Sequence, residues 1–132
     1  MILGIGTDIA DIRRFEQSIE KFGDRFLHRI FTDHERAYAD SKSGRAAYYA
    51  KRFAAKEAVA KALAGETTGS LSWKEVSVEN DPSGRPRAVL TGKALERLTK
   101  ALPKGHTGKV HLSLSDDYPY AQAFAVVEAG VE

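Results

Sequence analysis

The chain has 132 residues, 42% of them hydrophobic, and a net charge of +2, which suits one domain over residues 1–132 with an ordinary core. It contains no cysteine, which excludes disulfide frameworks, thiol nucleophiles and thiolate zinc sites. Its four histidines are too scattered for the ligand spacing of a zinc site.

Charge and hydropathy narrow the class of protein further. The amino terminus lacks the basic segment and apolar run of a signal peptide, and no apolar run approaches the ~20 residues of a membrane span, so we expect a cytoplasmic protein with no membrane partner. Between Arg13 and Lys61, twelve Lys and Arg stand against seven Asp and Glu, which favours an acidic or phosphorylated partner. These basic residues are interleaved with acids, unlike a nucleic-acid-binding arm, so we expect no nucleic-acid partner.

The first predicted element is a strand over residues 2–8. One of its faces carries two glycines and then a carboxylate, at Gly4, Gly6 and Asp8. Glycine within a strand usually marks the close approach of another backbone or of a ligand. Asp8, at the open end of this row, is therefore a candidate site residue. In the alternative interpretation, Asp8 or Asp11 is only the N-cap of the helix that begins near Ile12.

Helices are predicted next, near residues 12–21, 24–30, 33–40 and 44–64, with Thr32 or Asp33 as the cap of the third. The long fourth helix is apolar nearly all round, yet Glu57 and Lys61 share one of its stripes. A buried carboxylate must be paired, hydrogen-bonded or bound to a metal. Asp8 and Glu57 together would suit Mg²⁺, which typically takes one or two carboxylates beside waters and substrate phosphates. The alternative is an intrahelical Glu57–Lys61 ion pair, worth about 0.2–0.5 kcal/mol.

Strands dominate the second half of the chain. A loop at 65–70 precedes a predicted hairpin of strands 75–79 and 87–90. A short helix at 93–101 and two final strands, at 109–115 and 120–128, follow it. The strand at 109–115 has a polar face of His111, Ser113 and Ser115, a pattern that a strand exposed on one face also shows without any function. Because helices come early and strands late, the predicted fold class is α+β, with a mostly antiparallel sheet packed around the long buried helix.

Five segments in order resemble the holo-(acyl-carrier-protein) synthases of the 4'-phosphopantetheinyl transferase family. They are Gly4-Ile5-Gly6-Thr7-Asp8-Ile9, Phe31-Thr32 with Glu35, Arg52-Phe53-Ala54-Ala55-Lys56-Glu57-Ala58, Gly84-Arg85-Pro86, and His111-Leu112-Ser113-Leu114-Ser115 ahead of Tyr120-Ala121. The resemblance covers essentially the whole chain. It implies the phosphopantetheinyl transferase fold and a Mg²⁺-dependent transfer of 4'-phosphopantetheine from coenzyme A to a serine of apo acyl carrier protein. The other product is 3',5'-ADP, and the reaction serves fatty acid biosynthesis.

The resemblance also implies roles for individual residues. Asp8 and Glu57 would hold the metal, and Lys61 would act in catalysis by contacting a phosphate. The base that takes the serine proton is left open among Glu57, Asp8, a metal-bound water and His111. The implied coenzyme A contacts are Arg52, Lys56, Lys61, Gly84, Arg85, Pro86, His111 and Ser113. Relatives often have a serine-histidine pair where this chain reads Ser115-Asp116-Asp117, so no second histidine is expected to take part.

Partner surfaces follow from the same resemblance. The acidic acyl carrier protein would meet a basic, partly apolar surface formed by Arg13, Arg14, Phe22, Arg25 and Phe26. Phe22 and Phe26 are also spaced i,i+4, as in an ordinary core stripe. The family implies a homotrimer with active sites at the subunit interfaces.

Two functions from other classes remain as alternatives. One is a non-enzymatic binding module for an acidic protein or nucleic acid, which gives no reason for Glu57 on an apolar helix or for Asp8 after two glycines. The other is a metal-dependent phosphohydrolase that uses the same two acids, which would need an activated water and usually more carboxylates.

Overall fold

A computed structural model of the protein describes residues 1–64 and 71–131. Its first half runs from one long strand into four helices: β1 (Ile2–Asp11), α1 (Ile12–Phe22), α2 (Asp24–Ile30), α3 (Asp33–Asp40) and α4 (Arg45–Ala64). Its second half contains the 3-10 helix η1 (Trp73–Glu75), β2 (Val76–Asn80), β3 (Pro86–Leu90), α5 (Gly92–Ala101), β4 (His106–Asp117) and β5 (Tyr120–Val131). The predicted α+β class with antiparallel sheets is confirmed.

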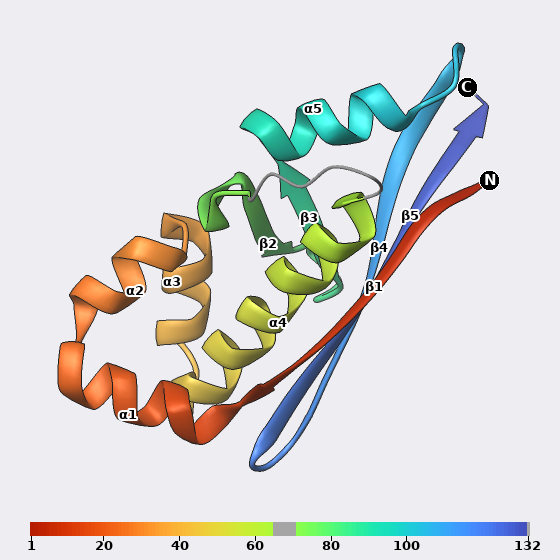
Figure 1. The fold of residues 1–132 in the computed structure, drawn as a ribbon. Helices are drawn as coiled ribbons and strands as arrows, with labels where there is room; N and C mark the ends of the chain where they lie inside the picture. Colours follow the sequence, from red (N-terminus) through yellow and green to blue (C-terminus); the bar gives the residue numbers. More distant parts are fainter. Residues whose placement is uncertain (65–70, 132) are drawn as a thin grey trace.

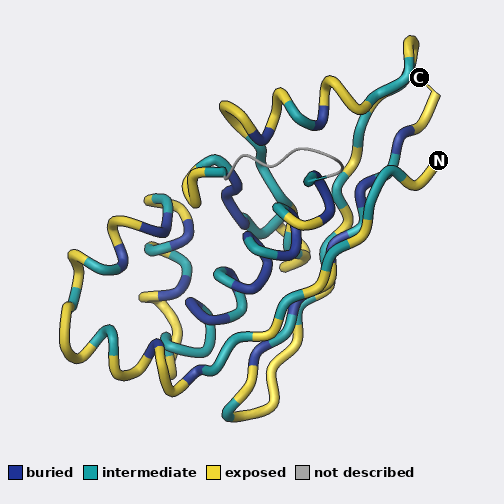
Figure 2. The backbone as a smooth tube through the Cα atoms, in the orientation of Figure 1, coloured by how far each residue is buried: buried dark blue, intermediate teal, exposed yellow. Residues whose placement is uncertain are grey.

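The long helix α4 lies along one face of a three-stranded sheet with strand order β1-β5-β4 (Figure 1). All strand pairs are antiparallel, and β2 with β3 forms a separate two-stranded sheet. Helices α1 to α3 gather around the first half of α4, while the β2-β3 hairpin and α5 lie beside its second half (Figure 1). The helix is largely buried between these groups (Figure 2).

The predicted elements are confirmed, with differences at their ends. The strands β1, β4 and β5 run several residues further than expected, and η1 was not expected at all. Asp11 caps α1, because its side chain accepts a hydrogen bond from the Arg13 amide at 2.9 Å. Thr32 caps α3. The predicted loop at 65–70 lies outside the described residues.

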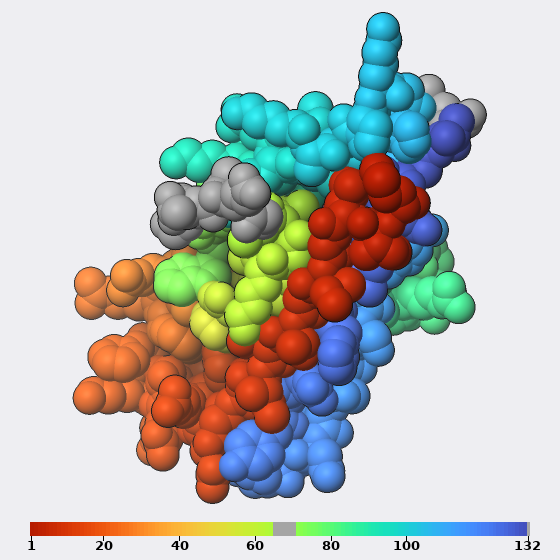
Figure 3. Space-filling model, turned by 45° about the vertical axis from the view of Figure 1, so that its right-hand side comes forward, coloured from red at the N-terminus to blue at the C-terminus, as the bar shows by residue number. Residues whose placement is uncertain are grey.

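The two glycines of β1 face the backbone of α4. A Cβ atom on Gly4 would lie 2.0 Å from the Ala62 carbonyl oxygen, and one on Gly6 would lie 2.0 Å from the Ala58 carbonyl oxygen. No side chain fits in that space, so the predicted close approach of another backbone is confirmed. Figure 3 shows β1 in direct contact with α4 on one side and with the C-terminal strands on the other.

The central strand β5 is adapted to the same helix. Its residues alternate, and those facing α4 are small and buried: Ala121, Ala123, Ala125, Val127 and Ala129. The outer face of the sheet also carries large apolar residues, and Ile5, Ile9 and Phe124 there are 72%, 60% and 52% exposed. These three side chains are thus open to solvent, whereas α4 packs against the other face (Figure 1).

None of the helices in the two described ranges is long and apolar enough to cross a membrane.

We predict that Gly6→Ala destabilises the fold by about 3 kcal/mol, because the new methyl group must push α4 away from β1. Gly130→Ala is the matched control, since a Cβ there meets nothing within 4 Å and should change stability by less than about 0.5 kcal/mol. Denaturant unfolding of both variants measures the difference. Equal stabilities would show that the helix and strand separate easily.

Candidate functional site

Two of the predicted site residues, Asp8 and Lys61, pair where β1 passes α4, and Glu57 lies one turn before Lys61 on the same helix. We call Asp8, Glu57 and Lys61 the β1-edge site. The Lys61 ammonium lies 3.1 Å from Asp8 Oδ1 and donates a second hydrogen bond to the Thr7 carbonyl oxygen at 2.9 Å. The close contact of α4 with Gly4 and Gly6 makes this reach possible. Asp8 is therefore the partner of a lysine, and the alternative role as helix cap belongs to Asp11.

Glu57 lies one turn before Lys61 on α4 and has a partner of its own. The indole Nε1 of Trp73 donates a hydrogen bond of 3.0 Å to Glu57 Oε1. Lys61 pairs with Asp8, on another element, so the structure differs from the alternative of an intrahelical Glu57–Lys61 pair. Lys61 thus pairs with one of the two carboxylates, Asp8, and Glu57 precedes it by one helical turn.

The donor set of the β1-edge site fits Mg²⁺ only if substrate completes the coordination. Among the described residues, no group of three or more His, Asp or Glu side chains gathers in a way that would hold a metal by itself. Two carboxylates would be the protein share of a site whose other ligands are waters and phosphate oxygens.

A second group of predicted residues lines a pocket beside β4, which we call the β4-edge pocket. It has a volume of about 320 Å³ and is lined by Tyr38, Tyr48, Lys51, Arg52, Asn80, Gly84, Pro86, Leu112, Ser113 and Leu114. Four of the implied coenzyme contacts are among them: Arg52, Gly84, Pro86 and Ser113. Two basic and two tyrosine side chains suit a ligand that carries both phosphate and an aromatic ring.

Arg52 organises this pocket from a buried position. Its Nη2 donates to Asn80 Oδ1 at 2.6 Å, and its guanidinium carbon lies 4.3 Å from the centre of the Tyr38 ring. Asn80 in turn donates to the Gly84 carbonyl oxygen at 3.1 Å, so Arg52 also holds the turn before β3. Burial lowers the pKa of Arg52 from its ordinary value.

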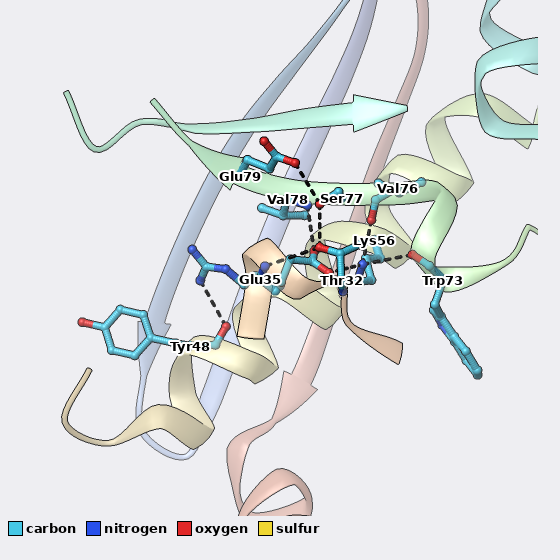
Figure 4. Close-up of polar contacts among 10 residues, drawn as sticks. Thr32, Glu35, Tyr48, Lys56, Trp73, Val76, Ser77, Val78 and Glu79 are labelled. Carbon is cyan, nitrogen blue, oxygen red and sulfur yellow. Dashed lines mark hydrogen bonds and ion pairs between the residues drawn. The ribbon is translucent and has the colours of Figure 1, made fainter. Parts of the chain in front are cut away.

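Lys56, in contrast, does not belong to either surface. Its ammonium makes a 2.7 Å ion pair with Glu35, and the two side chains are 1% and 0% exposed. It also donates to the carbonyl oxygens of Trp73 and Val76 at 3.0 and 2.6 Å (Figure 4). Three donors thus meet three protein acceptors, and none is left for a coenzyme phosphate. We therefore remove Lys56 from the coenzyme-binding set.

Glu35 is the other half of this buried pair. Its Oε2 accepts from the Val78 amide at 2.7 Å, and its Oε1 accepts from the Thr32 amide at 2.8 Å (Figure 4). The carboxylate thereby joins the start of α3, strand β2 and helix α4. Burial lowers the pKa of Lys56, and the adjacent Glu35 carboxylate opposes that shift.

Two other predicted coenzyme contacts lie apart from the β4-edge pocket lining. His111 is on the outer face of the sheet, where its Nε2 lies 3.0 Å from Glu128 Oε1 and both side chains are about half exposed. This hydrogen bond lowers the pKa of Glu128. Arg85 is exposed on the turn between β2 and β3.

The predicted carrier-binding residues lie on α1 and α2. Phe22 ends α1 and is 55% exposed, and Gly23, with a φ of 60°, breaks the chain direction before Phe26 on α2. Phe26 packs on the buried Phe15 ring with centroids 5.9 Å apart, so the core-stripe interpretation holds for Phe26 and not for Phe22. A pocket of about 380 Å³ there is lined by Lys21, Phe22, Arg25, Phe26 and Arg29.

The two arginines of the first helix turn differ in their contacts. Arg13 makes a 2.7 Å ion pair with Asp11 and holds the pKa of that carboxyl below its usual range. Arg14 is exposed on the same turn.

Comparison with known proteins identifies the family. The sequence profile of the 4'-phosphopantetheinyl transferase superfamily matches residues 4–123. The chain belongs to this superfamily. It is 54% identical to the holo-[acyl-carrier-protein] synthase of Agrobacterium fabrum over 129 residues, which cover 98% of this chain and 96% of that protein.

Solved structures give the same result. A crystal structure of the holo-[acyl-carrier-protein] synthase from Neisseria meningitidis is 36% identical, with a TM-score of 0.77 over 97% of this chain and 99% of that one. The Bacillus anthracis synthase, solved in complex with CoA (3',5'-ADP), is 32% identical, with a TM-score of 0.73 over 98% and 99% of the two chains. The resemblance seen in the sequence and the enzyme class, phosphopantetheinyl transferase, are confirmed.

Trp73 and the Glu35–Lys56 pair are contacts that sequence reasoning missed. The Thr32-x-x-Glu35 spacing is the signature of a capping box, which the structure contains, but it carries no sign that Glu35 also binds Lys56. Trp73 is the only tryptophan in the chain, and no local periodicity points from it to Glu57.

We predict that Lys56→Met destabilises this phosphopantetheinyl transferase by about 3–5 kcal/mol, because it leaves the Glu35 carboxylate buried without its cation. The control is Lys51→Met on the same helix, which breaks a partly exposed 2.9 Å pair with Asp116 and should cost about 1 kcal/mol or less. Urea unfolding measures both. Similar losses for the two variants would contradict the structural role of Lys56.

Proposed function

We propose that this transferase moves 4'-phosphopantetheine from coenzyme A to a serine of apo acyl carrier protein in a Mg²⁺-dependent reaction that releases 3',5'-ADP. The observation that carries the proposal is the β1-edge site of a chain of this superfamily, where Lys61 of α4 pairs with Asp8 of β1 and Glu57 lies one turn before Lys61. The names of its relatives and their complexes with CoA support the choice of substrates. One domain over residues 1–132 and a cytoplasmic location are proposed from length, composition and hydropathy, and a role in fatty acid biosynthesis from the resemblance.

The side chains suit this phosphoryl transfer. Asp8 and Glu57 would hold Mg²⁺, which when bound would neutralise charge on the coenzyme pyrophosphate and on the departing phosphate. The serine oxygen attacks the phosphorus that bears the pantetheine, the bond from this phosphorus to the oxygen of 3',5'-ADP breaks, and the serine proton passes to a base. Lys61 would supply a point charge to the pyrophosphate. The candidates for the base are Glu57, Asp8, His111 and a metal-bound water.

We further propose a homotrimer in which each active site forms between subunits. The β1-edge site and the β4-edge pocket belong to strands on opposite edges of one sheet, with β5 between them. A cyclic, head-to-tail assembly brings one edge of a subunit to the opposite edge of its neighbour. The outer face of the sheet, with Ile5, Ile9 and Phe124 exposed, supplies apolar area for such an interface.

The carrier surface is proposed on α1 and α2. The pocket of about 380 Å³ on these helices is lined by three basic residues, Lys21, Arg25 and Arg29, beside Phe22 and Phe26, and by no acidic residue. Arg14 is exposed near the start of α1. An acidic helical protein finds there both charge and an apolar contact, a combination that mainly raises the association rate and sets orientation.

We predict that Asp8→Ala and Glu57→Ala each lower the transfer rate by about 10²-fold or more, and that the double variant is hardly worse than either one. The assay follows 3',5'-ADP released from coenzyme A with and without a serine-bearing carrier. Glu96→Ala, which removes an exposed carboxylate on α5, is the control. Losses that multiply would argue against a shared metal, and release without carrier would favour a phosphohydrolase.

For the carrier surface, we expect Arg14→Glu to raise the KM for the carrier protein more than that for coenzyme A. Lys104→Glu makes the same charge change on an exposed loop after α5 and should leave both values near those of the wild type. Added salt should weaken carrier binding of the wild type, because exposed charges are screened over roughly 8–10 Å. A carrier KM that responds to neither change would rule out electrostatic docking.

The trimer predicts two results in solution. Phe124→Asp should shift the sedimentation equilibrium toward the single chain, whereas Leu95→Asp, at a similarly exposed position on α5, should not. Glu57→Gln alters the β1-edge site and Lys51→Glu alters the β4-edge pocket, and we expect each variant alone to be inactive. Mixed and reassociated subunits of the two should regain about one quarter of the sites if each site draws on two subunits. Mixtures that stay inactive would place both halves of the site in one chain.

A further inference from the structure

Trp73 stands between the buried Glu35–Lys56 pair and the β1-edge site. Its main-chain oxygen accepts a hydrogen bond from Lys56, and its indole nitrogen donates one to Glu57, the next residue on α4 (Figure 4 shows the first of these contacts). The same residue therefore contacts both a buried cation and an acid of the candidate site. Neither the superfamily profile nor the names of the relatives assign it a role.

The backbone around Trp73 is fastened on several sides. Lys56 also binds the Val76 carbonyl oxygen at 2.6 Å, and Glu35 binds the Val78 amide at 2.7 Å. Within η1, Glu75 accepts a hydrogen bond from the Ala94 amide of α5 at 3.2 Å. The segment from η1 into β2 is thus tied to α3, α4 and α5, so the position of the Trp73 main chain is fixed by groups that have no part in the reaction.

Trp73 is 41% exposed, and its indole ring packs on Phe53. Its centroid lies 6.1 Å from that of Phe53, which packs in turn on the buried Phe15 at 5.5 Å. Because the main chain is anchored and the ring packs on Phe53, the indole N–H has a defined position and direction. Its 3.0 Å hydrogen bond to Glu57 Oε1 therefore orients the Glu57 carboxylate.

We propose that Trp73 is a positioning residue that presents Glu57 to the metal, and that its fluorescence reports when the metal binds. This inference rests on the proposed role of Glu57 as a metal ligand. Ligating carboxylates are themselves hydrogen-bonded in metal sites, and removal of such a partner typically costs 10–100-fold in metal affinity. A lone flexible glutamate has to lose its rotamer freedom when it binds a cation, whereas a held one has already lost it.

The test compares Trp73→Phe with the wild type. Phenylalanine keeps a ring beside Phe53 and removes only the N–H donor. Mn²⁺ affinity is measured by electron paramagnetic resonance with coenzyme A bound and no carrier present, so that no turnover occurs. We expect Trp73→Phe to bind Mn²⁺ about 10–100-fold more weakly, and Glu57→Gln to bind it at least as weakly.

Tyr118→Phe is the matched control. It removes a hydrogen bond of 2.6 Å from an aromatic side chain to another glutamate, Glu16, on α1. Its Mn²⁺ affinity should equal that of the wild type. Circular dichroism and thermal melting of each variant confirm that binding is compared between folded proteins.

Because Trp73 is the only tryptophan, its emission is an independent readout. Mg²⁺ added to the wild type with coenzyme A should shift or quench this emission, and Glu57→Gln should abolish the response. In steady-state kinetics, Trp73→Phe should raise the Mg²⁺ concentration for half-maximal rate and keep most of kcat at saturating Mg²⁺.

The outcomes separate this inference from the proposed function. Wild-type Mn²⁺ affinity in Trp73→Phe, beside a loss in Glu57→Gln, would overturn the positioning role and leave the metal role of Glu57 standing. A Trp73→Phe variant with a reduced kcat and an unchanged Mg²⁺ dependence would also overturn the positioning role. Unaltered Mn²⁺ affinity in Glu57→Gln, or a wild type that binds no Mn²⁺, would overturn the metal role itself.

Discussion

The contact on which the rest of the structure depends is that between the backbones of β1 and α4. The carbonyl oxygens of Ala58 and Ala62 occupy the space where side chains of Gly6 and Gly4 would stand. This approach brings the last turns of α4 over the strand and lets Lys61 reach both Asp8 and the Thr7 carbonyl oxygen. The small, buried alanines of β5 allow the same helix to pack closely on this neighbouring strand. Small residues on two strands thus set the geometry of the candidate site.

The Glu35–Lys56 pair has a different role from the charges at the surface. Burying two ions is costly, and their attraction offsets the cost only when all their hydrogen-bonding groups are satisfied. Here each oxygen of Glu35 and each proton of Lys56 has a partner among backbone or side-chain groups of α3, α4, η1 and β2. Such a network favours one arrangement of these elements over alternatives that would leave a charge unpaired. The network thereby fixes the backbone of η1 beside Glu57.

Much of the fold could be predicted because its local signals are strong and agree with one another. Gly23, the Thr32–Glu35 capping box and the turn before Pro86 separate elements whose periodicity is clear. The close approach at Gly4 and Gly6 was also predictable, because glycine inside a strand has few other uses.

The site was only partly predictable, because α4 is apolar on nearly every side. On such a helix, spacing does not tell whether a lysine points inward or outward, so Lys56 and Lys61 looked alike. They differ through partners that are distant in sequence: Glu35 for Lys56 and Asp8 for Lys61. The hydrogen bond from Trp73 to Glu57 likewise depends on how η1 packs, which no local pattern encodes.

The position of Lys61 has a consequence for the solubility of the single chain. β1 is an edge strand of its sheet, and the outward backbone groups of an edge strand invite another strand to add on. Its outer face carries Ile5 and Ile9, which makes that edge a hazard for aggregation of newly made chains. Lys61 places its ammonium on the Thr7 carbonyl oxygen, and thereby covers one acceptor of this edge with a charge. Lys61, the proposed phosphate contact, thus also hinders the pairing of β1 with a strand of another chain when no substrate is bound.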